Sequence, residues 1–398
     1  MGHNARILRI YDLCEIRREM KEIGCDAAGV EIMAPKAVQR IIKLERVNVK
    51  AANLLKQTML AKGGEAAVAR GVADFSAAYS DVLLIGTLRQ FRLVLAQLGQ
   101  QPWGLPGISK ELSALLEHKP ASGRMYEWGQ RRLEIGKKTL IMGVLNITPD
   151  SFSDGGRFNT LNSALEQAHR MVAEGADIID IGGESTRPYG NNQPISAEEE
   201  MDRVLPVLEK LLQEIPVPIS LDTYKAATAK SALELGVHII NDVWGLQKDA
   251  QMAPVIANYN VPVIVMHNKT QPGYRDLLGE INSYLHQSIV IAEANGIPRE
   301  RIIVDPGIGF GKTRADNLLI IRNLREMEAL NCPILLGTSR KAFIGTTLDL
   351  PPTDRVEGTA ATIAIGIANG ADILRVHDVK EMARVAKMAD ALTREEVR

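Results

Sequence analysis

Residues 139–156 read TLIMGVLNITPDSFSDGG, in which a run of apolar and β-branched residues passes into a polar, Gly- and Ser-rich loop. A short apolar run bounded by turn residues is typical of a buried strand. From here to the carboxyl end the same unit recurs: an apolar run, a polar or Gly-rich turn, and a stretch with helical spacing. The repeat predicts eight strands, at residues 139–145, 177–181, 217–221, 237–240, 261–265, 302–304, 334–336 and 373–376.

The stretches between these runs predict helices. Gly175, Gly236, Gly296 and Gly370 each follow such a stretch, where glycine commonly ends a helix. Helices are expected at residues 162–174, 197–213, 225–235, 281–294, 315–329 and 356–369, with a last one from residue 379. Strands that alternate with helices pair in parallel, because a parallel crossover needs a helix-length connection. Eight units predict an α/β fold, the closed TIM (β/α)8 barrel, with an open doubly wound sheet as the alternative.

The first 125 residues do not follow this rhythm. Helical stretches at residues 13–23, 37–44, 51–61 and 110–118, with a possible strand at 81–85, predict a smaller α+β domain. We therefore expect this domain over residues 1–125 and the barrel over residues 126–398. Pro, Ser and Gly cluster at 120–124, as in a linker. Residues 131–138 predict a turn or short hairpin that closes the bottom of the barrel. The first domain carries no catalytic motif, and its role stays open.

The composition favours small-molecule partners. A formal net charge of -1 and 24% charged residues give no overall bias toward nucleic acid or membranes. Three cysteines lack metal-site spacing, and no apolar run approaches the roughly 18 residues of a membrane span. The amino terminus opens no uninterrupted apolar stretch. These features predict a cytoplasmic protein that binds neither nucleic acid nor membranes.

Polar residues stand where the predicted strands end. A TIM barrel gathers the carboxyl ends of its strands on one face, and that face carries the chemistry. The residues concerned are Asn146, Thr186, Arg187, Asp222, Asn241, Asp305, Ser339, Arg340, Lys341, Arg375 and His377. Single histidines near other strand ends, His238 and His267, are more often structural, and we expect no catalytic role for them.

The residue types at these strand ends indicate different chemistry. Carboxylates and an amide after strands three, four and six could recognise the edge of a nitrogen heterocycle, bind a metal, or form hydrogen bonds with one another. No His/Cys cluster or Glu-rich set accompanies them, which argues against a metal held by that set. Cations and donors converge after strands seven and eight, the usual anion site of this barrel, and indicate a phosphorylated substrate. The loop at 146–156 is predicted to be a mobile lid.

The order and spacing of these motifs resemble the dihydropteroate synthase family from about Arg131 onward. The matching segments are residues 146–156, 182–188, 222–223, 241–242, 305–311, 339–345 and 375–377. The resemblance implies a transferase of folate biosynthesis that joins 6-hydroxymethyl-7,8-dihydropterin diphosphate to p-aminobenzoate and releases pyrophosphate. It also implies a sulfonamide target, a Mg2+ cofactor and a homodimer.

The resemblance assigns roles to individual residues. The pterin is expected at Asp222, Asn241, Met266, Asp305, Phe310, Gly337 and Lys341. The diphosphate is expected at Asn146, Arg375 and His377, with Asn146 also a metal ligand, and p-aminobenzoate at Phe152, Thr186, Arg187, Pro188, Ser339 and Lys341. The expected catalytic residues are Asp222, Asp305, Lys341, Arg375 and His377.

The chain departs from the family pattern in two places and leaves two other functions open. It reads Met-His-Asn-Lys at 266–269, where Met or Gln and then Gly commonly follow the histidine, and Tyr189 stands where Gly is common. A pterin-dependent methyltransferase shares the Asp/Asn edge but has no use for the diphosphate cluster. A non-catalytic pterin-binding paralogue is the other alternative. Release of pyrophosphate that depends on p-aminobenzoate separates the synthase from both.

Overall fold

The computed structural model describes residues 3–8, 10, 12–116, 123–147, 157–184 and 194–394. The chain forms two compact units, Met1–His118 and Lys119–Arg398. The second unit begins earlier than the barrel expected from residue 126, because Arg124 and Met125 belong to a hairpin of the barrel unit. Among the described residues, no helix is both long and apolar enough for a membrane crossing.

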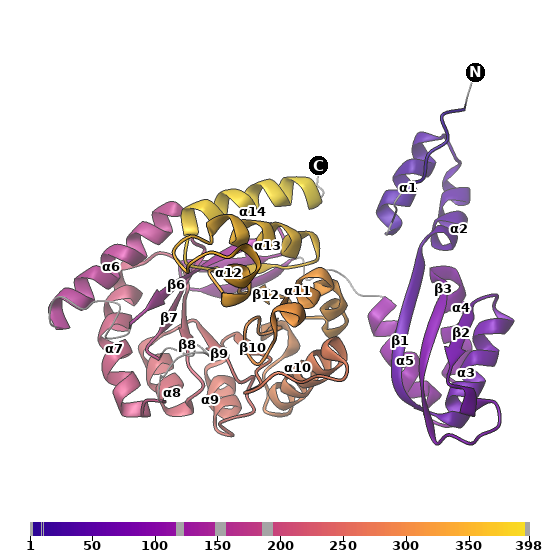
Figure 1. Cartoon of the computed structure of the whole chain (residues 1–398), viewed down its shortest axis with the longest axis horizontal. Helices are drawn as coiled ribbons and strands as arrows, with labels where there is room; N and C mark the ends of the chain where they lie inside the picture. Colours follow the sequence, from indigo (N-terminus) through magenta and orange to yellow (C-terminus); the bar gives the residue numbers. More distant parts are fainter. Residues whose placement is uncertain are drawn as a thin grey trace. The chain divides into compact units, whose positions relative to one another are not determined.

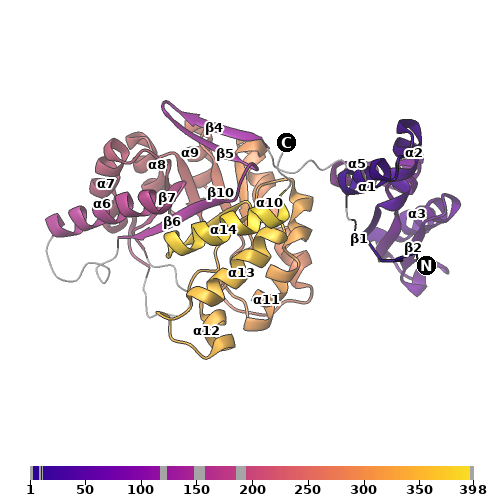
Figure 2. The same ribbon diagram turned by 90° about the horizontal axis from the view of Figure 1, so that it is seen from above.

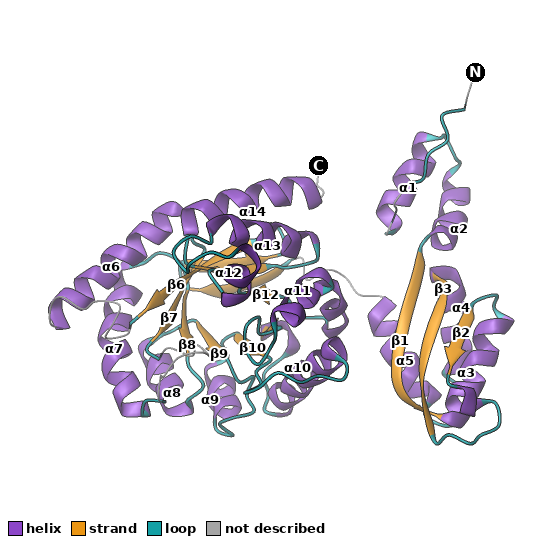
Figure 3. Cartoon of the chain, viewed as in Figure 1, coloured by secondary structure: helices purple, strands orange, loops and turns teal. Residues whose placement is uncertain are grey.

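The second unit is built on eight parallel strands (Figures 1 and 3). They are β6 (Leu140–Asn146), β7 (Ile178–Gly182), β8 (Ile219–Asp222), β9 (Ile239–Asp242), β10 (Val263–Met266), β11 (Ile302–Asp305), β12 (Leu335–Leu336) and β13 (Ile373–Val376). Their order is β11-β10-β9-β8-β7-β6-β13-β12. A parallel bridge between Val304 and Ile334 joins β11 to β12 and brings the two ends of the sheet together. The predicted TIM barrel is confirmed, and the open doubly wound sheet is wrong.

Helices surround this barrel, as Figure 1 shows. They are α6 (Arg157–Glu174), α7 (Ala197–Glu214), α8 (Ala226–Leu235), α9 (Met252–Tyr259), α10 (Leu277–Ala294), α11 (Arg314–Arg322), α12 (Ala342–Leu348), α13 (Val356–Ala368) and α14 (Val379–Thr393), with 3-10 turns η3 (Arg299–Arg301) and η4 (Leu324–Leu330). The single helix expected at 315–329 is therefore two elements, α11 and η4. Gly175, Gly236, Gly296 and Gly370 have φ between 91° and 108°, the left-handed conformation that ends a helix.

Alternation along the strands divides the barrel unit into two apolar cores. Ile141 and Ile179 belong to the core between the strands and the helices. Met142 and Ile178, one residue away on the same strands, belong to a core inside the barrel. Successive side chains of a strand point to opposite faces, and here both faces are buried. This double burial explains why the strands read as continuous apolar runs.

A hairpin of β4 (Arg124–Trp128) and β5 (Arg131–Ile135) lies at the amino-terminal end of the barrel (Figure 2). Tyr126, Leu133 and Ile135 pack into the inner core. Two arginines hold the hairpin in place through backbone carbonyls: Arg124 donates to Asn331 at 2.7 Å, and Arg131 donates to Leu212 at 2.6 Å. The hairpin expected to close the bottom of the barrel is confirmed, although it starts before the predicted residues 131–138.

The first unit contains a three-stranded antiparallel sheet in the order β1-β3-β2. Its elements are α1 (Leu13–Glu22), α2 (Ala27–Ala37), β1 (Gln39–Asn48), α3 (Val49–Ala61), β2 (Glu65–Val68), η1 (Arg70–Val72), β3 (Tyr79–Thr87), α4 (Leu88–Leu98) and α5 (Leu105–Leu116). The α+β class is confirmed, but the helix expected at 37–44 is wrong. That stretch lies mostly in β1, where Ile42 and Leu44 are buried and Ile41 and Lys43 are exposed, the alternation of a strand with one covered face.

Candidate active site

Four side chains from four strands meet at the carboxyl-terminal end of the barrel, with Arg375 of β13 at the centre. Its Nε donates to Asp180 Oδ2 at 2.6 Å, and its Nη2 donates to Asp222 Oδ2 at 2.8 Å. Asn241 Nδ2 donates to the same Asp180 oxygen at 3.3 Å. Parallel strands bring their carboxyl ends together, so residues far apart in the chain become one polar cluster.

Two oxygens of this cluster are buried acceptors without a hydrogen-bond partner in the described part of the chain: Oδ1 of Asp180 and Oδ1 of Asp222. A buried polar atom left unpaired costs free energy, which a ligand N–H can recover. Burial raises the pKa of Asp222 to about 7, although the neighbouring Arg375 charge lowers it. Burial also disfavours the charged form of Arg375, but Asp180 and Asp222 outweigh this and raise its pKa. The cluster therefore places a charged guanidinium beside two carboxylate oxygens that can each accept a hydrogen bond from a ligand.

A second group lies across the barrel. Lys341 Nζ donates to the Ile308 carbonyl and lies 4.9 Å from the centre of the Phe310 ring. Burial lowers the pKa of Lys341 to about 8, against the opposing charge of Asp305. Asp305 accepts the Gly307 N–H at 2.7 Å, and burial raises the pKa of this carboxyl. A lysine with a lowered pKa and a carboxyl with a raised pKa thus lie together at the barrel mouth.

These two groups line one small cavity of about 40 Å³, which we call the inner cavity. Its lining residues are Val144, Asp222, Asn241, Val243, Met266, Asp305, Phe310, Gly337, Ser339, Lys341, Arg375 and His377. The structure brings together here every residue that the sequence assigned to the pterin. An ideal Cβ at Gly337 would lie 3.9 Å from Lys341 Nζ, so a side chain at this position would extend toward the ammonium group.

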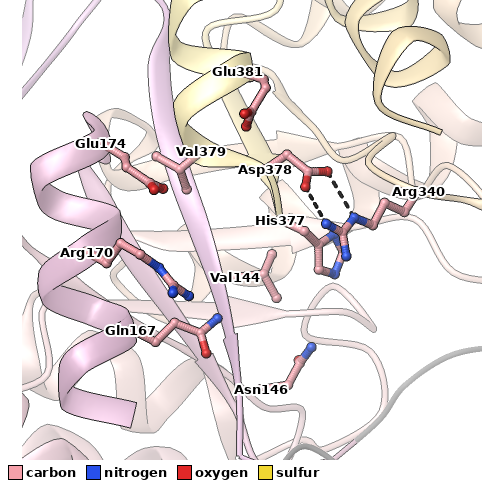
Figure 4. Close-up of a pocket in the computed structure, with 10 residues that line it drawn as sticks. All are labelled: Val144, Asn146, Gln167, Arg170, Glu174, Arg340, His377, Asp378, Val379 and Glu381. Carbon is pink, nitrogen blue, oxygen red and sulfur yellow. Dashed lines mark hydrogen bonds and ion pairs between the residues drawn. The ribbon is translucent and has the colours of Figure 1, made fainter. Parts of the chain in front are cut away.

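A larger cavity of about 470 Å³, the outer cavity, adjoins the first and is drawn in Figure 4. It is lined by Val144, Asn146, Gln167, Arg170, Glu174, Arg340, His377, Asp378, Val379 and Glu381. Val144 and His377 line both cavities. Of the expected diphosphate residues, Asn146 lies in the outer cavity, Arg375 in the inner one and His377 at the junction.

The expected p-aminobenzoate pocket is described only in part. Phe152, Thr186, Arg187 and Pro188, like Tyr189, lie outside the described residues. Ser339 lines the inner cavity, where its Oγ accepts the His377 N–H at 3.2 Å and lies 3.1 Å from His377 Nδ1. This contact joins a residue expected to bind the amine substrate to one expected to bind the diphosphate.

Sequence reasoning missed two buried groups. Asp180, completely buried, lies inside β7 rather than at its end; a carboxylate within an apolar strand was the available signal. Lys312 is 2% exposed, and its Nζ lies 2.8 Å from His267 Nδ1 and 3.0 Å from the Phe310 carbonyl oxygen. Burial lowers the pKa of Lys312 to about 7 and that of His267 to about 3. Lys312 therefore ties the Phe310 loop to the end of β10.

The two histidines expected to be structural line neither cavity. His238 Nδ1 accepts the Ile219 N–H at 3.1 Å, and its ring meets the Trp128 ring edge-on at 5.3 Å. Burial lowers its pKa to about 4. His267 supports Lys312, as described above. The unusual residues that follow His267 also line neither cavity: Asn268 donates to the Val243 carbonyl at 3.0 Å, and Lys269 to the Gly273 carbonyl at 2.7 Å.

A glycine-dependent turn completes the floor of the site. Gly307 has a φ of 69°, and a Cβ on it would lie 1.9 Å from the His267 carbonyl oxygen. Only glycine permits both this conformation and this close approach. The turn presents the Ile308 carbonyl to Lys341 and places Phe310 in the cavity wall.

Comparison with known proteins agrees with this geometry. Residues 142–377 match the family model of pterin binding enzymes. The chain is 53% identical over 260 residues to the dihydropteroate synthase of Bacillus subtilis, covering 65% of this chain and 90% of that protein. A dihydropteroate synthase crystal structure from Clostridium difficile, determined in the presence of pteroic acid, superposes with a TM-score of 0.65 at 51% identity, covering 66% of this chain and 100% of that one.

One relative also covers the first unit. The probable bifunctional folylpolyglutamate synthase/dihydropteroate synthase of Halobacterium salinarum is 40% identical over 391 residues, which span 96% of this chain and 46% of that protein. The methyltransferase alternative is set aside, because these relatives are synthases. With its barrel, its polar cluster and more than half its length matched, the chain belongs to the dihydropteroate synthase family of pterin-binding enzymes.

Proposed function

We propose that the inner cavity binds the pterin ring of 6-hydroxymethyl-7,8-dihydropterin diphosphate, which synthases of this family join to p-aminobenzoate. The observation that carries the proposal is the unpartnered Oδ1 of Asp222 in the cavity wall. A pterin presents adjacent N–H donors from its 2-amino group and N3, and such an edge pairs with a carboxylate. Two donors at this carboxylate stabilise its charged form and lower its pKa.

Lys341 and Asp305 complete the ring site. The Lys341 ammonium group lies near the Phe310 ring, where it can donate to the oxo oxygen or a ring nitrogen of a pterin held against that wall. Asp305 lies opposite, with one oxygen occupied by the Gly307 N–H. Both carboxylates, Asp222 and Asp305, would stabilise positive charge that develops on the pterin as its diphosphate departs.

In this proposal, the diphosphate leaving group is bound by Asn146, Arg375 and His377. Arg375 uses Nε and Nη2 for Asp180 and Asp222, and Nη1 makes no hydrogen bond to any described residue, so that donor remains for a phosphate oxygen. His377 adds a second donor at the junction of the two cavities. Neutralising the charge that grows on diphosphate is the main catalytic requirement, because the pterin can share the complementary positive charge.

Asn146 fits a role as a Mg2+ ligand, because an amide oxygen is a hard donor of the kind that Mg2+ accepts. The described residues contain no group of three or more His, Cys, Asp or Glu side chains that could hold a metal, so the diphosphate and water would supply most ligands. Bound Mg2+ supplies positive charge to the diphosphate. No strong general base is required, because an aniline nitrogen is already nucleophilic and its proton can leave late.

The p-aminobenzoate pocket, which sulfonamides also occupy, is proposed at Ser339 and Lys341 together with Phe152, Thr186, Arg187 and Pro188. We infer that the loops carrying the last four close over the barrel after the diphosphate site fills. Calorimetry with p-aminobenzoate should then give tighter binding when pyrophosphate is present. Equal affinity with and without pyrophosphate would argue against this order.

The site assignment is tested by Lys341→Ala and Arg375→Ala in an assay of pyrophosphate release that depends on p-aminobenzoate. Each change should reduce turnover by at least about a hundredfold, because each removes a charge that faces substrate. Lys230→Ala is the matched control, since this lysine is 61% exposed on α8. Near-wild-type rates in either site variant, with a folded protein, would contradict the assignment.

The first unit, the assembly and the location are further proposals. We propose that the protein is a cytoplasmic homodimer and that the first unit serves docking, dimer contact or stability rather than catalysis. A chain starting at Lys119 keeps the whole β4–β5 hairpin, whereas one starting at Tyr126 loses Arg124 and its bond to Asn331. The Lys119 form should retain coupling activity. Its complete inactivity, with an intact fold, would place an essential group in the first unit.

A further inference from the structure

One residue at the strand ends, Arg340, has no role in the proposed site. It lies between Ser339 and Lys341, in the loop between β12 and α12. Its guanidinium lies directly against the Asp378 carboxylate on one side of the outer cavity (Figure 4). Nε donates to Asp378 Oδ2 at 2.9 Å, and Nη2 donates to Oδ1. This bidentate pair joins the loop after β12 to the loop after β13.

The backbone of Arg340 adopts a conformation that needs outside support. Its φ is 56°, a left-handed value that is unfavourable for a residue other than glycine. Neighbouring elements hold it there: its N–H donates to Thr359 Oγ1 at 3.2 Å, and its carbonyl accepts from Arg355 Nη1 at 2.9 Å. With three groups of one residue anchored, the loop has a defined geometry.

The partner residue also gives up an alternative interaction. Asp378 is the N-cap of α14, a position where an Asp side chain usually accepts a backbone N–H of the first turn. Here the side chain makes no such bond and turns to Arg340 instead. The Asp378 side chain is 12% exposed and that of Arg340 is 42% exposed, so only the carboxylate side of the pair is shielded from water.

We propose that the Arg340–Asp378 pair is a positioning device that holds Ser339 against His377, and so aligns the diphosphate site with the site for the amine. Ser339 directly precedes Arg340, and His377 directly precedes Asp378, so the ion pair and the Ser339–His377 hydrogen bonds connect the same two loops. Lys341 has a separate anchor in the Ile308 carbonyl. The inference rests on the proposed diphosphate site.

Electrostatics and positioning make opposite predictions for one variant. If the two charges acted on diphosphate only through space, Arg340→Gln would weaken anion binding and Asp378→Asn would strengthen it, because the latter removes a negative charge. If the pair positions His377, both changes should weaken binding, since each breaks the same bidentate contact. The direction of the Asp378→Asn effect therefore separates the two explanations.

The experiment measures pyrophosphate and 6-hydroxymethylpterin binding by calorimetry on the full chain, together with the coupling rate. Arg340→Gln and Asp378→Asn should each weaken pyrophosphate binding by about fivefold or more and lower kcat, while pterin affinity stays within about twofold. The variant with both substitutions should bind pyrophosphate no more weakly than the single variant that has the lower affinity. Arg340→Lys, which keeps the positive charge but lacks the planar fork for a bidentate contact, should lose less than Arg340→Gln.

The matched control is Glu293→Gln, which breaks another bidentate pair, with Arg299, near the amino-terminal end of the barrel. It should leave pyrophosphate binding unchanged. Tighter or unchanged pyrophosphate binding in Asp378→Asn overturns the positioning role. If His377→Ala leaves pyrophosphate binding intact, the proposed diphosphate site itself is wrong. If His377→Ala abolishes binding but Arg340→Gln and Asp378→Asn do not alter it, the diphosphate site stands and only the positioning role of the Arg340–Asp378 pair is wrong.

Discussion

Replacing Asp180 by asparagine tests whether this buried carboxylate orients Arg375, which we propose as a diphosphate ligand. The change keeps the shape of the side chain but removes the charge that accepts Arg375 Nε at 2.6 Å. A hydrogen bond to a charged group contributes about 1.5–3 kcal/mol, and its loss from a transition-state contact lowers kcat/KM by roughly ten- to a hundredfold. Arg375 keeps its bond to Asp222, so the guanidinium should become less well oriented without leaving the site.

The same substitution has a second, independent consequence for pH dependence. The negative charge of Asp180 contributes to the raised pKa of Asp222, which burial and its neighbours bring to about 7. If ionised Asp222 is required, wild-type kcat/KM rises with pH through about 7. Without the charge of Asp180, the pKa of Asp222 falls, so the midpoint of this rise should move to lower pH.

The assay is pyrophosphate release dependent on p-aminobenzoate, measured from pH 5 to 9. Asp372→Asn provides the control, since Asp372 is a partly buried carboxylate near Arg394 that accepts the Ile334 N–H at 3.0 Å at the other end of the barrel. It should lower thermal stability and leave the midpoint in place. A rate for Asp180→Asn within threefold of wild type, or an acid midpoint that rises, would refute the reasoning.

Three further outcomes are expected. Burial lowers the pKa of Lys312 from 10.5 to about 7, so between these pH values the unfolded chain binds more protons than the folded one. The free energy of unfolding of the wild type should therefore rise with pH in this range. Urea unfolding at pH 7 and 9 should show a smaller rise of this free energy for Lys312→Met. Leu133→Ala should cost about 2–5 kcal/mol of stability, seen as a lower Tm, with unchanged kcat at 25 °C. Because burial brings the pKa of Lys341 to about 8 without substrate, kcat/KM should fall as pH rises through that value, and a kcat/KM that stays flat to pH 10 would exclude a required ammonium group.

The barrel could be predicted because its strands are buried on both faces and therefore appear as uninterrupted apolar runs. Even β12, with only Leu335 and Leu336 in regular pairing, lies inside a predicted run. Residues 37–44 were predicted as a helix because their apolar positions fit more than one periodicity. The packing of β1 against β3 decides in favour of a strand, which is a tertiary effect.

Most residues of the candidate site could be predicted because they stand where the predicted strands end. Asp222, Asn241 and Asp305 are the terminal or near-terminal residues of their strands, and all three line the inner cavity. Asp180 escaped this criterion because two residues of β7 follow it. Lys312 escaped because its burial depends on His267, a partner 45 positions away in the chain.

The bridge between Val304 and Ile334 closes the barrel between β11 and β12, and we call this junction the seam. Four residue pairs join β10 to β11, whereas a single bridge joins β11 to β12 in the described residues. Asp305 follows one side of this seam and Gly337 lies just beyond the other, so the weakest strand pairing borders the inner cavity. Lys341 and Arg375, which also line the inner cavity, lie in the loop after β12 and on β13, the two strands that follow the bridge. A single bridge leaves fewer inter-strand hydrogen bonds to protect the backbone, so amide hydrogen exchange should be fastest there among the barrel strands.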